Sequence, residues 1–345
     1  MASIFLITLK FDNHFLFLLI TLGSLLVIIH ENLFIIYLGV EIQAFSTYII
    51  ISKNGKNGSE AGLKYYILGS ISSGFFLLIL SFITSNGCSM IITDIGDNLS
   101  LIVIILVVFF KLGLFPFYFW IPDIYEGSTW PIIGLLILPK ISILSVLLKI
   151  SSYFSNDLIV ILLVISIVIG TIGAFNQSKI KRLLAYSGVT HMGFIVLPLF
   201  LLSVNISFVY LFIYLITLYS FIFIINKKSL FLISSSNINT VKKISISFLL
   251  LSMAGIPPLY GFIVKIMVLV SCMTYNYYFV SLVIMLFSII SVSFYLRLIN
   301  ILHFKSAIIN NWSNILIDKN HTHINDYFLG LFFFVIIGVR NFIFW

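Results

Sequence analysis

Four ionisable residues stand inside long apolar runs of this sequence, where an ionised side chain is costly. Glu41 lies between IIYLGV and IQAFSTYIII, and Lys111, Lys140 and Lys265 lie in three further apolar runs. In a membrane-spanning helix such a charge costs about 2.5–3.5 kcal/mol on insertion scales, so it needs compensation. Burial disfavours the charged forms of these groups and mutual pairing favours them, so a Glu–Lys pair can exchange protons. The four residues are candidates for a proton or ion pathway, with structural ion pairing as the alternative.

Three other ionisable residues lie near the ends of apolar runs. His191 stands in YSGVTHMGF beside the hydroxyls of Ser187 and Thr190, and an imidazole can relay protons because it titrates near neutral pH. A histidine with a purely structural hydrogen bond is an equally open interpretation. Asp123 and Glu126 occur in WIPDIYEGSTWP, an aromatic and proline-rich stretch typical of an interfacial turn, which favours a structural role for both.

The sequence contains no pattern that predicts a redox or nucleotide site. There is no glycine-rich phosphate loop, nucleophile elbow, zinc signature or histidine pair typical of haem ligation. Cys88 and Cys272 are isolated thiols without metal-ligand spacing. We therefore expect no metal, no bound cofactor and no redox catalysis in this chain itself.

Membrane-spanning helices must carry the candidate residues. Of 345 residues, 61% are apolar and 9% are charged. A hydrocarbon core about 30 Å thick needs roughly 20 apolar residues per helix, and runs of that length recur. They are too long and too continuously apolar for β-barrel strands. We predict a single all-α membrane domain, a polytopic transmembrane helix bundle of about eleven spans. The spans are expected near 14–30, 33–52, 62–85, 98–121, 130–149, 158–176, 187–203, 206–226, 245–268, 276–300 and 327–344.

The charges between these spans predict a topology. The net charge of +8 is scattered over loops and does not form a nucleic-acid patch. Loops after even-numbered spans hold most of the basic residues, including Lys179 and Arg182, whereas the opposite loops carry Asp94, Asp97 and Asp157. By the positive-inside rule the basic loops and the N-terminus lie on the inner side.

Prolines interrupt two of the predicted spans. Pro116 follows Lys111, and Pro257 and Pro258 precede Lys265. A broken helix frees backbone groups that lipid cannot satisfy, so it must be buried in protein or line a wet cavity. Two broken helices half a chain apart are typical of transporters built from repeats. We expect repeat one at 33–150, repeat two at 158–300, and a C-terminal loop and last helix at 301–345.

Five stretches carry most of these features. They are VEIQAFSTYIIIS around Glu41, SEAGLKYYILGSISSGFF from Ser59, FKLGLFPFYFWIPDIYEGSTWP from Phe110, GTIGAFNQSKIKRLLAYSGVTHMGF from Gly170 and LLSMAGIPPLYGFIVK ending at Lys265. In composition, order and spacing they resemble the subunit 2 family of mitochondrial complex I, which is similar to the N-type antiporter-like subunits of bacterial NADH dehydrogenases. One departure is Tyr118, which stands where the family usually has histidine.

The resemblance implies two inverted five-helix repeats with discontinuous helices. It assigns the family's glutamate to Glu41 and its pathway lysines to Lys111, Lys140 and Lys265. In this hypothesis Lys111 holds a proton that Glu41 tunes, Lys140 passes protons laterally, and Lys265 releases them or hands charge to the next subunit.

The resemblance also implies a subunit of a proton-translocating NADH:ubiquinone oxidoreductase in the mitochondrial inner membrane, with its N-terminus on the matrix side. NADH, FMN, iron–sulfur clusters and ubiquinone would then belong to partner subunits, and electrons would not enter this chain. Its partners would be other membrane-arm subunits, including antiporter-like neighbours, and membrane lipids, without nucleic acid. A cation/proton antiporter or ion-pumping hydrogenase subunit, and a purely structural membrane-arm subunit, are the alternatives.

Overall fold

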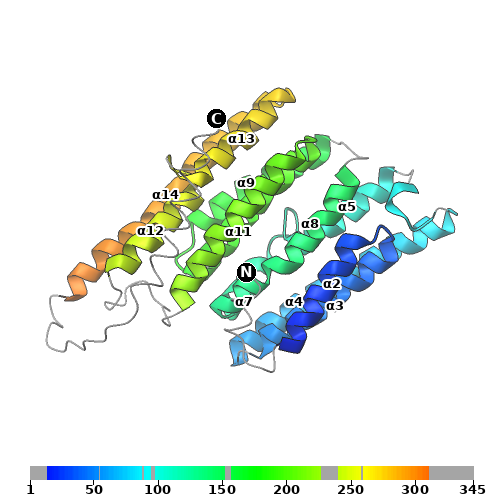
Figure 1. Ribbon diagram of the computed structural model, residues 1–345, viewed down its shortest axis with the longest axis horizontal. Coiled ribbons are helices and arrows are strands. Elements are labelled where there is room, and N and C mark those ends of the chain that lie inside the picture. The colour runs from blue at the N-terminus through cyan, green and yellow to red at the C-terminus, as the bar shows by residue number, and fades with distance from the viewer. Residues whose placement is uncertain are drawn as a thin grey trace. The chain divides into compact units, whose positions relative to one another are not determined.

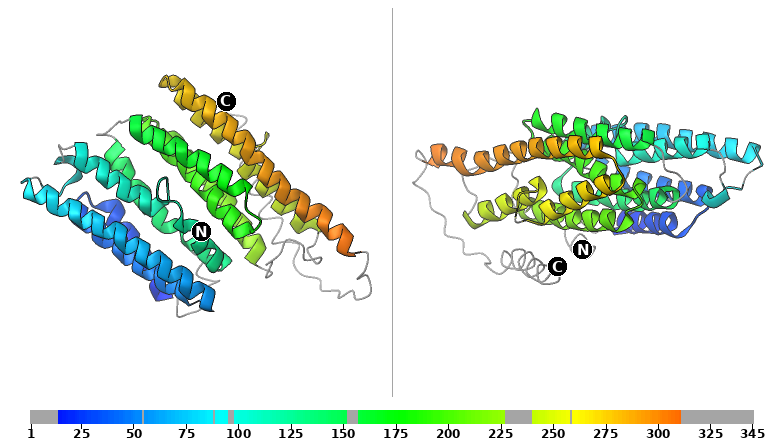
Figure 2. Two further views of the ribbon diagram at one scale, coloured as in Figure 1. Left: turned by 180° about the vertical axis from the view of Figure 1, so that it is seen from behind. Right: turned by 90° about the horizontal axis from the view of Figure 1, so that it is seen from above.

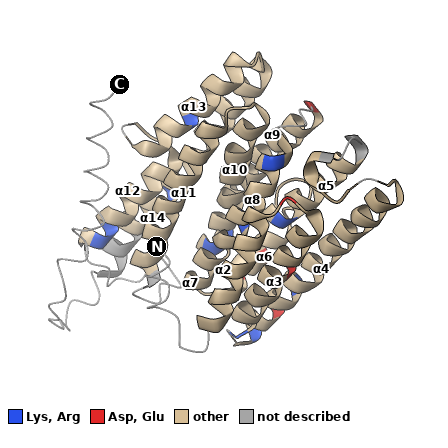
Figure 3. Ribbon diagram, turned by 45° about the vertical axis from the view of Figure 1, so that its right-hand side comes forward, with Lys and Arg blue, Asp and Glu red and all other residues tan. Residues whose placement is uncertain are grey.

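The computed structural model describes residues 14–53, 55–87, 89–94, 98–151, 157–226, 240–257 and 259–310. Within these ranges the regular structure is helical, apart from an isolated bridge between Asn32 and Ile91. In the same ranges seven helices are long and apolar enough to cross a membrane, and three shorter apolar helices accompany them. The charged residues are sparse along the ribbon (Figure 3). The predicted all-α transmembrane architecture is confirmed.

The chain forms two compact units, each described by itself. The first comprises residues 1–211 and 267–287, and the second comprises residues 212–266 and 288–345. Helices of the first unit are α2 (His14–Ile29), α3 (Leu33–Ser52), α4 (Gly55–Ser85), α5 (Asn98–Leu112), α6 (Trp120–Gly127), α7 (Trp130–Leu135), α8 (Ile137–Ser151), α9 (Asp157–Phe175) and α10 (Ile180–Phe200), with a short 3₁₀ turn at Ile92–Asp94. The second unit contains α12 (Thr240–Ala254) and parts of α11 (Val204–Asn226), α13 (Tyr260–Thr274) and α14 (Tyr278–Asn310).

Close helix pairing builds the first unit. Helix α2 packs along α3, which also packs against α4, and α9 packs along α10 (Figures 1 and 2). The α2–α3 contact depends on small residues, since a Cβ on Gly23 would lie 2.8 Å from the carbonyl oxygen of Gly39. Helix α3, which carries Glu41, is therefore held between two neighbours at short range.

The helices follow the predicted spans, with informative differences. Ten of the eleven spans coincide with helices, and 327–344 lies outside the described residues. Helix α10 begins at Ile180, seven residues before the predicted 187, because its basic first turn finds acidic partners. The predicted span 130–149 is interrupted at Leu136. Pro139 explains this interruption, because it has no N–H for the carbonyl of Leu135 and its ring crowds that carbonyl.

The first predicted helix break is confirmed between α5 and α6. Gly113, directly after α5, has φ +74°. The N–H of Leu114 donates to the carbonyl of Phe109 at 2.9 Å, and the N–H of Phe117 donates to the carbonyl of Leu114 at 2.7 Å. This is a glycine-terminated helix end followed by a tight turn. Pro116 lies in that turn, as predicted.

The second predicted break lies between α12 and α13 and repeats this pattern. Gly255 has φ +79°, the N–H of Ile256 donates to the carbonyl of Leu251 at 3.3 Å, and the N–H of Leu259 donates to the carbonyl of Ile256 at 3.0 Å. Pro257 lies in this turn, while Pro258 is outside the described residues. In their described residues, the segments GLFPFY at 113–118 and GIPPLY at 255–260 thus share a left-handed glycine at the helix end and a turn closed by one backbone hydrogen bond. This match supports the two-repeat organisation, which stays a prediction.

We expect Gly113→Ala to lower the thermal stability of the protein. The left-handed backbone costs a non-glycine residue about 1–2 kcal/mol, and the new Cβ would collide with the side chain of Ile121. The thermal unfolding midpoint of the detergent-solubilised protein measures the effect. Gly74→Ala is the matched control, because a Cβ there meets no atom within 4 Å. Equal unfolding midpoints for the two variants would contradict the prediction.

Candidate functional site

The structure brings Glu41 of α3 and Lys111 of α5 together. The Lys111 Nζ lies 3.6 Å from Glu41 Oε1 and donates a hydrogen bond of 3.1 Å to the carbonyl of Gly69 on α4. The side chain of Glu41 is 33% exposed and that of Lys111 is 12% exposed. Among the described residues Glu41 Oε1 is buried without a hydrogen-bond partner. The pair is therefore loose, in contact but not closed by a hydrogen bond.

The C-terminal end of α5 attracts a positive charge. Lys111 lies in the last turn of α5, where the helix dipole places partial negative charge. The carbonyl of Phe110 in this turn accepts two hydrogen bonds, one of 3.1 Å from the N–H of Gly113 and one of 3.2 Å from the indole Nε1 of Trp120. Trp120 is the first residue of α6, so the second half of the broken helix caps the first half.

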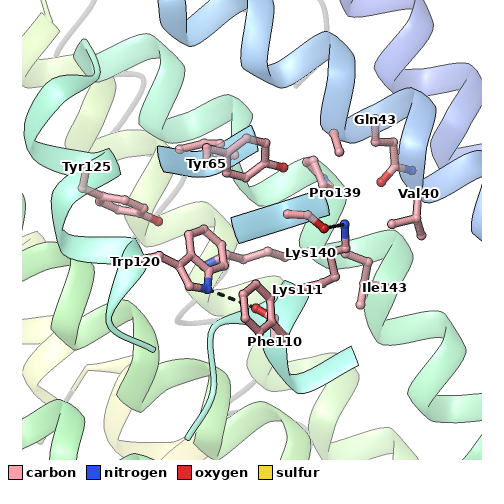
Figure 4. A pocket seen from close by; sticks show the side chains of 13 residues that line it. Val40, Gln43, Tyr65, Phe110, Lys111, Trp120, Tyr125, Pro139, Lys140 and Ile143 are labelled. Carbon is pink, nitrogen blue, oxygen red and sulfur yellow. Dashed lines mark hydrogen bonds between the residues drawn. The ribbon is translucent and has the colours of Figure 1, made fainter. Parts of the chain in front are cut away.

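A cavity of about 30 Å³ connects the surroundings of Lys111 and Lys140 (Figure 4). This volume has room for at least one water molecule, which needs about 10–15 Å³. A second cavity of about 20 Å³ is lined by Glu41, Tyr37 and again Lys111. Lys111 therefore lies between a cavity shared with Glu41 and a cavity shared with Lys140.

Lys140 is a buried ammonium of α8. Its side chain is 5% exposed, and its Nζ lies 5.9 Å from the ring centre of Tyr125. The ion pairs found among the described residues do not include it. The aromatic face offers weak compensation. A buried cation held so weakly is suited to giving up its proton.

Sequence reasoning missed Gln43 and Ser142. Gln43 is 1% exposed and lines the cavity of Lys111 and Lys140. Ser142 Oγ lies 3.1 Å from Gln43 Oε1, and among the described residues Gln43 Nε2 is buried without a partner. The available signal was a polar residue two positions after Glu41 in an apolar span.

His191 lies elsewhere in the first unit, on α10. It is buried, and its Nδ1 lies 3.0 Å from the hydroxyl of Tyr210 on α11. The hydroxyls of Ser187 and Thr190 donate to the carbonyls of Leu184 and Ser187 in their own helix. Such back-bonding is usual for serine and threonine inside helices. A relay role for His191 stays a prediction and would involve Tyr210.

Lys265 belongs to the second unit. It is 6% exposed, and its Nζ donates hydrogen bonds to the carbonyl of Ala254 at 2.7 Å and to Ser291 Oγ at 3.1 Å. Lys111 and Lys140 belong to the first unit.

Asp123 and Glu126 of α6 anchor that helix through ion pairs. Asp123 Oδ2 lies 3.4 Å from the Nζ of Lys64 on α4, and Asp123 Oδ1 lies 3.3 Å from Arg182 of α10. Glu126 pairs with Lys179 and Arg182. These contacts hold α6, and with it the Trp120 cap, against two neighbouring helices. They agree with the predicted structural role of both carboxylates.

We expect Glu126→Gln to lower the thermal unfolding midpoint at neutral pH. The Lys179 ammonium, followed by Arg182, holds the pKa of the Glu126 carboxyl below its ordinary 4.5, although partial desolvation opposes this. A lowered carboxyl pKa stabilises the fold above the ordinary value, and this stabilisation is lost as the pH falls through the lowered pKa. Because the pair is partly exposed, its contribution is about 1 kcal/mol or less.

The unfolding midpoint of the purified protein, scanned from pH 7 toward pH 4, measures this effect. The difference between the native protein and Glu126→Gln should shrink as the pH falls. Glu60→Gln is the control, because Glu60 is 70% exposed and its ion pair is with Lys64, one turn away. A difference that grows on acidification would contradict the assignment.

Two further features are the surroundings of Tyr118 and the absence of a metal-binding cluster among the described residues. Tyr118, at the departure from the family pattern, lies beside Tyr186 with ring centres 6.4 Å apart. Across the described ranges no group of three or more His, Cys, Asp or Glu residues is placed to hold a metal ion.

Comparisons with known proteins agree with this geometry. The family model described as NADH:quinone oxidoreductase/Mrp antiporter, transmembrane, matches residues 30–291. NADH-ubiquinone oxidoreductase chain 2 of Metridium senile is 32% identical over 324 residues, which cover 84% of this chain and 83% of that one. NADH-quinone oxidoreductase subunit N of Ruthia magnifica is 31% identical over 331 residues, 85% of this chain and 68% of that one.

A solved structure shows the same fold. A chain of respiratory complex I from Thermus thermophilus, solved with bound aureothin, superposes with a TM-score of 0.82 at 23% identity, covering 95% of this chain and 78% of that chain. The family model, the relatives and the shared fold agree. The chain therefore belongs to the NADH:quinone oxidoreductase/Mrp antiporter family of membrane proteins, together with chain 2 of NADH-ubiquinone oxidoreductase.

Proposed function

We propose that this chain is a proton-translocating membrane-arm subunit of respiratory complex I, the NADH:ubiquinone oxidoreductase of the mitochondrial inner membrane. The observation that carries this proposal is the loose Glu41–Lys111 pair beside the first helix break, with Lys140 across a shared cavity. The similarity to chain 2 and subunit N relatives supports the assignment to complex I.

Lys111 is the central proton carrier in this proposal. A contact between Glu41 and the Lys111 ammonium stabilises the charged form of the lysine. When Glu41 is drawn away, Lys111 keeps its hydrogen bond to the Gly69 carbonyl and loses its countercharge. The proton then leaves Nζ more readily. A water in the shared cavity can accept it and donate a proton to the neutral amine of Lys140.

The later steps concern Lys140 and Lys265. Lys140 receives the proton in surroundings without a carboxylate partner among the described residues, so it does not trap the charge. Lys265 then releases a proton or passes charge to a neighbouring subunit. Each elementary charge moved against the membrane potential costs roughly 2.3 kcal/mol per 100 mV. The partner subunits must supply this energy.

The redox chemistry lies outside this chain in the proposal. NADH, FMN, iron–sulfur clusters and ubiquinone are bound by partner subunits, whose electron transfer changes the electrostatic setting of Glu41. The basic loops and the N-terminus face the matrix, as the distribution of lysines predicts. Other membrane-arm subunits and membrane lipids surround the bundle.

Native electrophoresis of mild-detergent membrane extracts tests the assignment to complex I. The polypeptide is followed by mass spectrometry and compared with an in-gel stain for NADH oxidation. Comigration with the large NADH-oxidising band is the expected result. Migration alone, or with transport proteins only, would contradict it.

A cation/proton antiporter subunit is the second candidate, because the matching family model spans Mrp antiporters as well. The same gel distinguishes the two functions. An antiporter subunit would migrate with other transport proteins, and vesicles containing it would acidify or alkalinise in response to a sodium gradient without NADH.

A further inference from the structure

Lys265 is a buried cation of α13, and its described hydrogen bonds go to α12 and α14. No aspartate or glutamate occurs between Asp157 and Asp318, so α12, α13 and α14 contain none. Lys111, in contrast, has Glu41 at 3.6 Å. Burying an ammonium requires a compensating charge or dipole. The question is which group compensates Lys265.

The end of α12 supplies the compensating negative charge. The carbonyl of Ala254, the last residue of α12, accepts a 2.7 Å hydrogen bond from Lys265 Nζ. The last carbonyls of a helix have no partner within the helix, and together they carry the equivalent of about half a negative charge. The ammonium thus bonds the one end of the helix that attracts a cation.

Gly255 makes room for this contact. A Cβ on Gly255 would lie 2.8 Å from Lys265 Cδ, so the lysine stem lies directly against the glycine backbone. The left-handed φ of +79° at this residue also turns the chain away from α12. Gly255 therefore ends the helix and at the same time admits the side chain that caps it.

Ser291 of α14 fixes the direction of the ammonium. It is buried, and its hydroxyl donates its own proton to the carbonyl of Ser288 at 2.6 Å. The Oγ, 3.1 Å from Lys265 Nζ, is therefore left as an acceptor. A hydroxyl held in this way accepts from a lysine N–H and does not donate to the lysine.

The two breaks differ in how their caps respond to protons. At the first break the cap of α5 is the indole N–H of Trp120, which carries no charge and does not titrate. At the second break, which has the same backbone pattern, the cap is an ammonium. Among the described residues, the second break therefore has a cap whose charge depends on a proton, whereas the cap of the first break does not.

We propose that the C-terminal end of α12 is the countercharge of Lys265, and that Ser291 is the positioning residue that holds the ammonium against it. Loss of the proton from Lys265 then weakens the cap and loosens the end of α12. This inference extends the proposed function. Its link to proton pumping rests on that function, whereas the contact between Lys265 and the end of α12 does not.

Hydrogen exchange in the intact, detergent-solubilised complex tests this, read at the amides of Gly255 and Ile256, which donate to Leu251. Lys265→Met should speed their exchange by about fivefold to thirtyfold, since a cation at a helix end contributes up to about 2 kcal/mol. Lys265→Arg keeps the charge and should preserve protection. Ser291→Ala should speed exchange by roughly twofold to tenfold.

Two further serine variants distinguish positioning from packing. Ser293→Ala is the matched control, because Ser293 lies on the same helix, makes the same kind of bond to its own helix at Ile290, and is exposed. It should leave exchange and pumping unchanged. Ser291→Thr keeps the hydroxyl and should restore the protection and the proton pumping that Ser291→Ala loses.

The proposal is overturned if Lys265→Met leaves exchange at Gly255 and Ile256 unchanged, or if Ser291→Ala behaves like Ser293→Ala. A failure of the proposed function would be a different result from a failure of this inference. It would be shown by normal pumping in an assembled Lys111→Met complex, and faster exchange in Lys265→Met would still establish the cap.

Discussion

Replacing Lys111 with methionine is expected to reduce proton translocation by the assembled complex by at least about tenfold. Methionine fills a similar volume but carries no exchangeable proton, so the cavity shared with Lys140 loses its donor. Glu41 Oε1 would be left facing an apolar group. Breaking a fully buried ion pair costs about 3–5 kcal/mol, and the cost is smaller here because Glu41 is 33% exposed.

Quenching of a pH-sensitive dye in proteoliposomes during NADH oxidation measures this loss. Reduction of an artificial acceptor by the redox subunits is the control for assembly, and it should be unchanged. Pumping at the native rate in a complex that contains the variant would favour the purely structural interpretation of the buried charges.

Replacing Lys140 with methionine is expected to reduce proton translocation without lowering the stability of the complex. Lys140 is buried with an aromatic face as its described compensation, so removing its charge relieves a desolvation cost, and a hydrophobic replacement of a buried charge is often neutral or stabilising. Proton translocation should nevertheless fall by about tenfold or more. The measurements are dye quenching and the thermal unfolding midpoint of the same preparation.

Lys149→Met, on the same helix, is the matched control and should show the opposite behaviour. Lys149 Nζ donates to the carbonyls of His30 at 2.6 Å and Ile28 at 3.0 Å, which close the end of α2. Its loss should lower the unfolding midpoint and leave pumping intact. A Lys140→Met complex that is destabilised but pumps normally would assign Lys140 a structural role.

Much of the fold could be predicted because apolar length is a strong signal. Helix α3 has the predicted bounds of 33–52, since a continuous apolar run ends in polar residues on both sides and Asn32 caps its first turn. Both breaks were predicted from prolines in apolar runs. The interruption at Leu136 was missed because one proline near the start of a long apolar run does not reveal whether the helix before it continues.

The residue types of the site were predictable from the sequence, and the family resemblance paired Glu41 with Lys111, but the local sequence did not show their contact. Glu41 and Lys111 are 70 positions apart, and their proximity follows from how α3, α4 and α5 pack, which local sequence does not encode. The partners that turned out to matter were backbone carbonyls, those of Gly69 and Ala254. A carbonyl has no signature in the sequence, so these contacts required the structure.

The most direct test of the central claim is a double-mutant cycle on the pair, with proton translocation per NADH oxidised measured for Glu41→Gln, Lys111→Met and the double variant in proteoliposomes. If the two residues act as one unit, each single variant loses most of the pumping and the double variant is no worse than Lys111→Met. Losses that multiply independently, or a Glu41→Gln variant with native pumping, would contradict the account.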